Sequence, residues 1–285
     1  MTVPHFHRND RAAALPARVS RTWLLVSAAA DEETIAAALE SEADSILLDL
    51  EDGCPENLKD ASREKIVQLL ENSMTAWVRI NTMGTEHWKK DVQALNGVRG
   101  LRGVMLATTE HPDQVTRTAM MLAAGTPVIA LIESAVGMLN VVDIARAPGT
   151  FRLAFGVGDY RRDTGVSADP IALSYARSQL VLASRAGELP GPIDGPSVGK
   201  YGGDLMKECH YTTMHGMTGK LLLDPRQAET INLTLAPSDE EIQWAQEMLN
   251  EAGGGNVPKD GSYLPRLARA RKVSELAKTY GLWRS

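Results

Sequence analysis

Short hydrophobic runs alternate with amphipathic segments along the chain from Thr22 onward. The runs are rich in Val, Ile and Leu and show little alternation of polar and apolar positions, which is typical of strands buried on both faces. They lie at residues 22–28, 45–50, 76–81, 103–108, 127–133, 152–158, 191–193 and 219–224, and the last two are the least distinct.

The segments between the runs have the spacing of amphipathic helices. The clearest are 31–43, 57–73, 111–125, 134–149 and 169–187. Strands that alternate with helices predict a parallel sheet with right-handed crossovers. Because there are eight candidate strands, the pattern favours a closed (β/α)8 TIM barrel over an open doubly wound sheet. No G-x-G-x-x-G motif follows the first run, which weakens the dinucleotide-binding alternative.

Both ends of the chain depart from this pattern. Residues 1–20 lack an apolar run of the kind found in a secretory signal, and we expect them to form a mobile leader. The barrel is predicted to occupy residues 21–235. Residues 236–285 are predicted to form a C-terminal helical extension, with helices at 238–252 and 264–282 and a flexible GGGN break between them. We expect this extension to pack under the barrel or to reach a neighbouring subunit.

Composition narrows the class of protein. The chain has 285 residues, of which 44% are hydrophobic and 23% charged, as in an ordinary globular protein. A net charge of −6 disfavours binding to nucleic acid or to anionic membranes, and no apolar run is long enough to cross a bilayer. The two cysteines, Cys54 and Cys209, form no CxxC pair, which argues against a disulfide framework or a structural zinc site. We therefore expect a cytoplasmic protein with a small-molecule substrate.

Charged residues cluster where the predicted strands end, and these ends meet at one rim of a barrel. The residues are Asp49, Glu51, Asp52, Arg79, Glu133 and Asp159. Carboxylates gathered there would repel one another, and burial would raise their pKa values unless a cation neutralised them. Oxygen ligands without His or Cys indicate Mg²⁺, and Glu133 and Asp159, on adjacent strands, are the expected pair of ligands.

Each of these residues also has a purely structural interpretation. Asp49 and Asp52 are suited to cap a helix, and Arg79 to pair with Glu51. Glu133 is suited to the acidic first turn of the helix that follows it. The convergence of several such residues on strand ends favours the functional interpretation. The sequence does not identify the general base, and Asp49 and a metal-bound water are both candidates.

Several motifs carry a resemblance to a known family. The segments RTWLLV, ADSILLDLEDG, VRIN, LIESAVGMLN, LAFGVGDY, LSYARSQLVLASRAGELPGPIDG and DPRQAETIN resemble, in order and spacing, the HpcH/HpaI aldolase and citrate lyase beta subunit superfamily. The similarity runs from about Arg21 to Asn232 and is strongest to the citrate lyase beta-like branch, which includes malyl- and citramalyl-CoA lyases.

The resemblance implies a (β/α)8 barrel, commonly a homotrimer, that binds Mg²⁺ and cleaves or forms a carbon–carbon bond between an acyl thioester and a 2-oxo acid. Carried over to this chain, it makes Glu133 and Asp159 metal ligands and Arg79 the residue that binds the substrate carboxylate. It places Glu51 and Asp52 around the waters of the metal. It places Arg21 at the edge of the site as a further substrate-binding residue.

The chain departs from the family pattern in its loops. Ser27-Ala28 stands where the family has Pro-Gly, Ala107-Thr108 where it has Pro-Lys, and Leu223-Asp224-Pro225 where it has Ile-His-Pro. The Glu-Asp pair that the family carries before the sixth loop is reduced to Gly158-Asp159. The tail segment 261–265 lacks the acid that family members supply to a neighbouring subunit.

Three hypotheses stay open: a Mg²⁺-dependent lyase acting on a thioester of CoA or of a carrier protein, an aldolase acting on free 2-oxo acids without CoA, and a non-catalytic metabolite-binding or assembly subunit.

Overall fold

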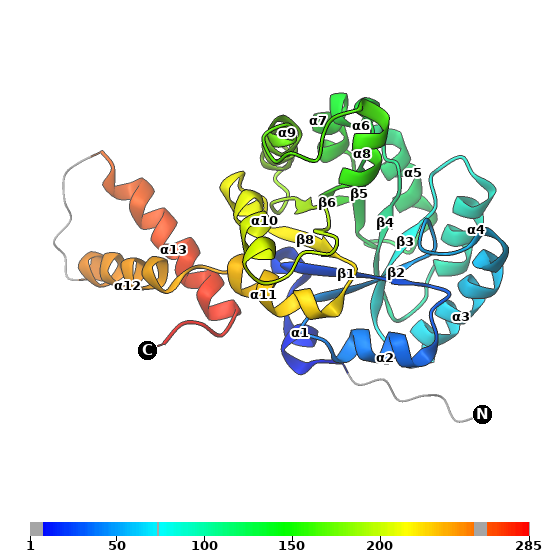
Figure 1. Ribbon diagram of the computed structural model, residues 1–285, viewed down its shortest axis with the longest axis horizontal. Helices are drawn as coiled ribbons and strands as arrows, with labels where there is room; N and C mark the ends of the chain where they lie inside the picture. Colours follow the sequence, from blue (N-terminus) through cyan, green and yellow to red (C-terminus); the bar gives the residue numbers. More distant parts are fainter. Residues whose placement is uncertain (1–7, 73, 254–260, 285) are drawn as a thin grey trace.

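The computed structural model describes residues 8–72, 74–253 and 261–284. In this part of the chain, eight parallel strands close into a barrel in the order β1 to β8, as Figure 1 shows. The strands are β1 (Thr22–Ser27), β2 (Ser45–Asp49), β3 (Ala76–Ile80), β4 (Leu101–Leu106), β5 (Val128–Ile132), β6 (Thr150–Phe155), β7 (Ile193–Asp194) and β8 (Gly219–Leu222). The prediction of a TIM barrel is confirmed.

Helices surround the barrel and continue beyond it. They are α1 (Asp10–Ala14), α2 (Glu32–Glu40), α3 (Lys59–Asn72), α4 (Glu86–Leu95), α5 (Pro112–Met121), α6 (Ala135–Leu139), α7 (Val141–Arg146), α8 (Val157–Thr164), α9 (Ser174–Ala186), α10 (Gly202–Met214), α11 (Ala228–Thr234), α12 (Asp239–Gly253) and α13 (Tyr263–Thr279). Short 3-10 turns lie at Ala17–Val19, Glu56–Leu58 and Pro225–Gln227.

The strands are buried on both faces, as their composition predicts. Inside the barrel, Trp23, Trp77 and Leu221 belong to one cluster of buried side chains, and the two indole rings meet edge to face with centroids 5.2 Å apart. Outside it, Leu24 and Val26 of β1 belong to a second cluster that joins the barrel to its helices. This alternation fixes the register, because a shift by one residue would exchange the two faces.

The strand register sets up the rim. Ser27 pairs with Asp49, and Asp49 pairs with Arg79, at the carboxyl ends of β1, β2 and β3. The sixth predicted strand is too long, because the chain enters helix α8 at Val157, so Asp159 lies in the first turn of a helix. The predicted helix at 134–149 is divided at Asn140 into α6 and α7.

Residues 8–20, which belong to the predicted leader, make specific contacts with the rest of the chain. Ala12 and Leu15 are buried, and Arg8 donates hydrogen bonds to the backbone oxygens of Leu39 and Ala43. From inside the barrel, the Arg152 guanidinium donates to the backbone oxygen of Ser20 at 2.9 Å. Residues 8–20 therefore pack against the amino-terminal end of the barrel, and residues 1–7 lie outside the described part.

Arg21 lies at this same end of the barrel and not at the edge of the candidate site, which corrects the position expected for it. Its Nε atom is 3.0 Å from Oδ2 of Asp44, and its Nη1 atom donates to the backbone oxygen of Asn232. The guanidinium stacks on Tyr280, 3.9 Å from the ring centroid. Arg21 precedes β1, so the full length of that strand separates it from the opposite rim.

Helices α12 and α13 pack on each other around their own hydrophobic cluster, which includes Ile242, Met248 and Val273. Figure 1 shows this helical pair projecting away from the barrel. The end of α13 is fastened to it, since the Tyr280 hydroxyl donates to the backbone oxygen of Val19 at 2.8 Å. The predicted GGGN break falls almost entirely outside the described residues. Among the described helices, none combines the length and apolar character required to cross a membrane.

The contacts of Asp44 predict a large loss of stability for Asp44→Asn. Asp44 is fully buried and accepts hydrogen bonds from Arg21 and Arg11. Burial by itself would raise the pKa of Asp44, but the two arginines outweigh burial and lower it. Neutralising one member of a buried pair leaves an uncompensated charge. We therefore expect the free energy of unfolding, measured with urea at pH 7, to fall by about 3 kcal/mol.

The matched control is Glu42→Gln, which removes the half-exposed partner of Arg11. Exposed ion pairs contribute little, so this change should cost less than about 1 kcal/mol. Equal effects of the two substitutions would contradict the structural role of Asp44.

Candidate active site

Arg79 is held at the rim by a bidentate ion pair with Asp49. Its Nε and Nη2 atoms lie 2.7 and 2.6 Å from Oδ1 and Oδ2 of Asp49. The same two oxygens accept the backbone N–H groups of Glu51 and Gly53. A Cβ atom on residue 53 would lie 2.3 Å from Oδ2, so only glycine permits this approach. Asp49 therefore fixes the orientation of Arg79.

This arrangement changes what can be expected of Asp49. Each of its carboxylate oxygens already accepts two hydrogen bonds, and the side chain does not belong to the lining of the neighbouring cavity. A general base needs a free lone pair directed at the substrate. The geometry thus makes Asp49 a residue that positions Arg79, and it does not fit the role of general base.

A cavity of about 480 Å³ lies at the carboxyl end of the barrel, and Glu51, an ion-pair partner of Arg79, is part of its lining. Its lining is predominantly acidic. It consists of Glu51, Asp52, Thr108, Glu110, Glu133, Ser134, Asp159, Arg162 and Asp163. The structure thus brings together four of the acids that the sequence predicted to converge, with Arg79 bordering them.

Glu133 is the most deeply buried of these acids. Its Oε1 atom accepts a hydrogen bond from the backbone N–H of Thr108 at 2.6 Å and another from the Thr108 hydroxyl at 3.1 Å. A Cβ atom on residue 156 would lie 2.4 Å from Oε2, so Gly156 leaves room for the carboxylate. Burial raises the pKa of Glu133 to about 7, and the charges of Glu51 and Asp159 add to the effect against the hydrogen bond from Thr108.

Glu51 forms an ion pair with Arg79, but the hydrogen-bonding capacity of its carboxylate is not filled. Its Oε2 atom is 3.1 Å from Nη1 of Arg79, yet this buried oxygen accepts no hydrogen bond. Burial raises the pKa of Glu51 despite the nearby arginine, and the charge of Asp52 raises it further. A buried carboxylate oxygen without a donor, close to a second acid whose pKa is raised, is an environment that a cation and its bound waters would stabilise.

Asp159 and Asp52 also belong to the acidic lining, together with Glu110 and Asp163. The Asp159 carboxylate is 2.6 Å from Nη2 of Arg162, an exposed side chain on the same helix. Asp52 is exposed and lies in the loop after β2. Within the described residues, no three His, Cys, Asp or Glu side chains are already close enough together to hold a metal. Mg²⁺ commonly keeps several waters and can be bound through only two protein carboxylates, so a group of three is not required for the predicted site.

Thr108 is a contributor that the sequence did not single out. Its φ angle is +44°, in the left-handed region where a β-branched residue is rare. Such a conformation costs on the order of 1–3 kcal/mol. The only sequence signal at this position was that Ala107-Thr108 stands in place of Pro-Lys, and a dipeptide alone does not indicate backbone strain.

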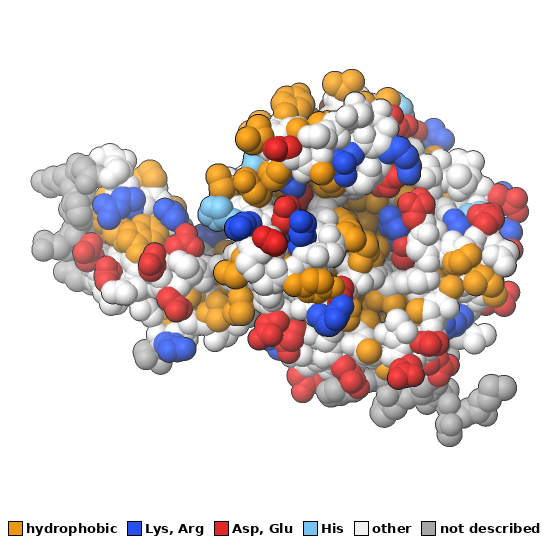
Figure 2. Space-filling model, in the orientation of Figure 1, with side chains coloured by type: hydrophobic (Ala, Val, Ile, Leu, Met, Phe, Trp, Pro, Cys, Tyr) orange, Lys and Arg blue, Asp and Glu red, His pale blue; other side chains and the backbone are white. Residues whose placement is uncertain are grey.

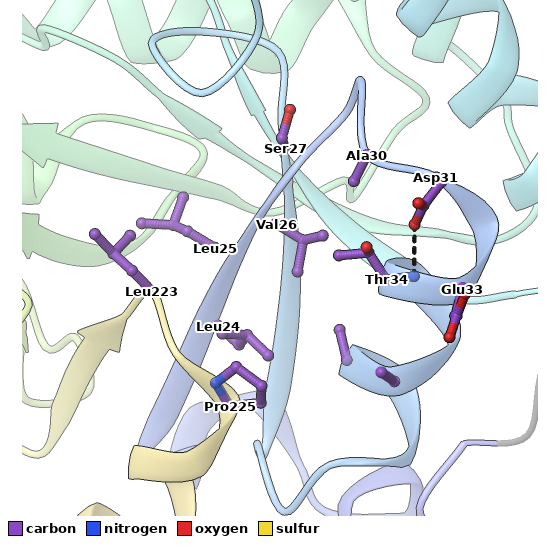
Figure 3. A pocket seen from close by; sticks show the side chains of 12 residues that line it. Leu24, Leu25, Val26, Ser27, Ala30, Asp31, Glu33, Thr34, Leu223 and Pro225 are labelled. Carbon is purple, nitrogen blue, oxygen red and sulfur yellow. Dashed lines mark hydrogen bonds between the residues drawn. The ribbon is translucent and has the colours of Figure 1, made fainter. Parts of the chain in front are cut away.

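A second pocket of about 450 Å³ lies between β1, α2 and the segment after β8 (Figure 3). Most of its lining is apolar, including Leu24, Val26 and Leu223, and its polar residues include Asp31 and Glu33. No Lys or Arg belongs to this described lining. Its lining includes Ser27, the register partner of Asp49, so the pocket adjoins the rim of the barrel.

The comparison with protein families decides the identity of the fold family. The model of HpcH/HpaI aldolase/citrate lyase matches residues 22–190, and that of the HpcH/HpaI aldolase C-terminal domain matches residues 240–281. The chain belongs to the HpcH/HpaI aldolase/citrate lyase family. The second match shows that α12 and α13 are also part of the family architecture.

Individual relatives agree with this membership. Citrate lyase subunit beta of Leuconostoc mesenteroides subsp. cremoris is 31% identical, over 82% of this chain and 86% of that protein. A (3S)-malyl-CoA thioesterase of Cereibacter sphaeroides is 30% identical, over 83% and 86%. The crystal structure of CitE from Mycobacterium tuberculosis, in complex with magnesium, acetoacetate and coenzyme A, has a TM-score of 0.74 and 26% identity, over 93% and 99%.

The raised pKa of Glu133 predicts a pH-dependent cost in stability. The unfolded side chain loses its proton near pH 4.5 and the folded one near pH 7, so the metal-free protein should lose stability as the pH rises between these values. The change from 4.5 to about 7 corresponds to roughly 3 kcal/mol. Glu133→Gln does not titrate, so its unfolding free energy should gain that amount relative to the native protein between pH 4.5 and pH 8.

Urea unfolding in the presence of a chelator measures this difference. Glu86→Gln, which alters a highly exposed acid on α4, serves as the control, and its unfolding free energy should change with pH as that of the native protein does. If the unfolding free energy of Glu133→Gln also follows that of the native protein across this pH range, Glu133 is not the group whose raised pKa lowers the stability.

Proposed function

We propose that the protein is a Mg²⁺-dependent carbon–carbon lyase that cleaves or forms a bond between an acyl thioester and a 2-oxo acid. The observation that carries the proposal is the pairing of a rigidly held Arg79 with a buried, electrostatically strained Glu133 at one cavity. Family membership supports the reaction class, because the named relatives include citrate lyase beta subunits and citramalyl-CoA lyases.

Glu133 and Asp159 are the residues that would hold the metal, and Glu51 and Asp52 would accept hydrogen bonds from its waters. When bound, Mg²⁺ supplies Lewis-acid stabilisation of the negative charge that develops on oxygen as the bond breaks. The protein contributes carboxylates that are already gathered and partly desolvated. A bound cation would relieve the repulsion that Glu133 experiences from Glu51 and Asp159.

Arg79 would bind the carboxylate of the 2-oxo acid. Its Nε and Nη2 atoms are committed to Asp49, whereas its Nη1 atom faces the imperfectly paired Glu51. Burial alone would lower the pKa of Arg79, but Asp49 and Glu51 raise it above its ordinary value, so the guanidinium stays charged. A substrate carboxylate approaching Nη1 therefore meets a fixed positive charge next to the metal ligands.

Calorimetric titration of oxaloacetate, pyruvate and glyoxylate, each with and without Mg²⁺, tests the proposal. We expect binding only in the presence of Mg²⁺, since a 2-oxo acid needs both the cation and Arg79. Glu133→Gln should abolish the metal-dependent binding, and Arg79→Ala should weaken it at least tenfold through loss of a charge-assisted hydrogen bond. Arg117→Ala, on the exposed face of α5, is the control and should bind as the native protein does.

Circular dichroism of each variant separates loss of binding from loss of folding. Binding that does not depend on Mg²⁺, or that survives in folded Glu133→Gln, would contradict the metal assignment. A complete absence of binding would instead favour a non-catalytic metabolite-binding or assembly subunit.

One observation favours a second candidate, an aldolase that acts on free 2-oxo acids without CoA. The pocket beside β1 adjoins the rim, yet acidic Asp31 and Glu33 line it and no Lys or Arg does. Lys65 and Arg226 lie nearby, but Lys65 is bound to the backbone oxygen of Ala30 and Arg226 is paired with Asp224. The phosphate groups of CoA would find little free positive charge in this pocket.

The two candidates differ in their acyl substrate. With a 2-oxo acid and Mg²⁺ present, a lyase acting on thioesters should condense acetyl-CoA or propionyl-CoA at least tenfold faster than the corresponding free aldehyde. An aldolase should show the reverse order. The measurement is product formation followed by mass spectrometry over a panel of both substrate types, with Glu133→Gln as the inactive control.

We also propose a homo-oligomer, with a trimer as the state that the family favours, located in the cytoplasm. Hydrophobic side chains gather over α9 and α10 on the face shown in Figure 2. Met206, Tyr211 and Met214 line a groove of about 650 Å³ on α10. Tyr175 and Leu182 of α9 are exposed. Exposed apolar surface of this kind is typical of contacts between subunits.

A further inference from the structure

Thr108 has a strained backbone that its place in the fold does not explain. In the described part of the chain, Thr108 and Glu188 are the two residues other than glycine with positive φ. Glu188 directly follows the end of helix α9, where left-handed residues commonly terminate helices. Thr108 follows a strand, ends no helix and carries a β-branched side chain. Such outliers persist when surrounding contacts enforce them, and they cluster at functional sites.

The neighbouring contacts hold the turn at Thr108 from both sides. Before it, the backbone N–H of Ala107 donates to the backbone oxygen of Ile80. After it, the backbone N–H of Thr109 donates to the backbone oxygen of Leu131 at 2.9 Å, and the Thr109 hydroxyl donates to that of Leu106. The turn is thus fastened to β3, β4 and β5, which gives it little freedom to relax.

The strained conformation directs two donors at one atom. The backbone N–H and the hydroxyl of Thr108 both reach Oε1 of Glu133, at 2.6 and 3.1 Å. The Thr82 hydroxyl in turn donates to the Thr108 hydroxyl at 3.1 Å, so the proton of the latter is free to point at Glu133. Among the described residues, no donor contacts Oε2 of Glu133, which lies over Gly156.

We propose that Thr108 is a positioning residue for Glu133, and that it occupies Oε1 so that Oε2 is the oxygen presented to the cation. The inference rests on the proposed function for the identity of that cation. The contact between Thr108 and Glu133 is a property of the chain itself, and it is therefore testable without metal. Thr82 belongs to the same unit, because it orients the Thr108 hydroxyl.

Thr108→Val tests the proposal because it replaces the hydroxyl by a methyl group of similar size. We expect the calorimetric Kd for Mg²⁺ to rise at least tenfold, since one of the two donors that fix the carboxylate is lost. Thr108→Ser restores the hydroxyl and should bring the Kd back to within about threefold of the native value. An affinity for Mg²⁺ unchanged in Thr108→Val, or equally weak in Thr108→Ser, would overturn the proposal.

Thr109→Val is the matched control. It removes the hydroxyl bond within the same turn but touches neither Glu133 nor Thr108's donors. We expect it to lower the Tm while leaving the Kd for Mg²⁺ unchanged. If Thr109→Val weakens Mg²⁺ binding as much as Thr108→Val does, the effect is general loosening of the turn, and Thr108 has no specific role.

A double-mutant cycle in metal-free protein keeps this inference separate from the proposed function. Thr108→Val and Glu133→Gln should shift the Tm non-additively, because the two residues interact directly. Additive shifts would overturn the role of Thr108 even if the native protein binds Mg²⁺. Failure of the native protein to bind Mg²⁺, with a non-additive cycle, would remove the proposed function but leave the positioning of Glu133 by Thr108 supported.

Discussion

The repulsion among the acids at the carboxyl end of the barrel is the constraint on which the site depends. Glu133, Glu51 and Asp159 surround one cavity, and the pKa values of the first two are raised. Arg79 compensates part of this charge, but two of its nitrogens are committed to Asp49. The folded chain thus carries an excess of buried negative charge that its own cations do not neutralise, which is a costly state unless the site binds a cation.

The surrounding backbone is adapted to tolerate this charge. Gly53 and Gly156 stand where any side chain would collide with Asp49 or Glu133. Thr108 adopts a left-handed conformation, in which its backbone N–H and its hydroxyl both donate to Glu133. Each feature costs conformational freedom or strain, and each keeps a carboxylate in a position that it would otherwise leave. The stability for this comes from the apolar barrel below, where side chains of alternate positions fill both faces of the strands.

The sequence predicted the barrel and most of the rim, because both depend on local patterns. Buried parallel strands have continuous apolar runs, and residues that end such strands converge in any closed barrel. The position of Asp159 was only partly predictable, since Gly156-Val157-Gly158 reads equally well as the end of a strand and the start of a helix. Arg21 was misplaced because a motif gives the order of residues but not the end of the barrel at which a side chain lies.

The sequence also could not show the strain at Thr108 or the packing of residues 8–20, because both arise from contacts between distant segments. The two residues that flank Thr108 are bonded to β3 and β5, and Arg8 of the N-terminal segment donates to carbonyl groups in the last turn of α2 and after it. The lack of a continuous apolar run led to the prediction of a mobile leader, whereas Arg8 and Arg11 donate hydrogen bonds from this segment to residues 39–44. Charge complementarity over long separations leaves no periodic signal in a single sequence.

The two ends of the barrel show why an arginine–carboxylate pair is not by itself a sign of function. The pairs of Arg21 with Asp44 and of Arg79 with Asp49 are both bidentate. At the amino-terminal end, Arg21 and Arg11 together lower the pKa of Asp44, so the buried negative charge is compensated within the protein. At the carboxyl end, the pair leaves Glu51 and Glu133 with raised pKa values. What distinguishes the carboxyl end is this unbalanced negative charge, because an acidic site that its own arginines do not neutralise gains stability when it binds a cation.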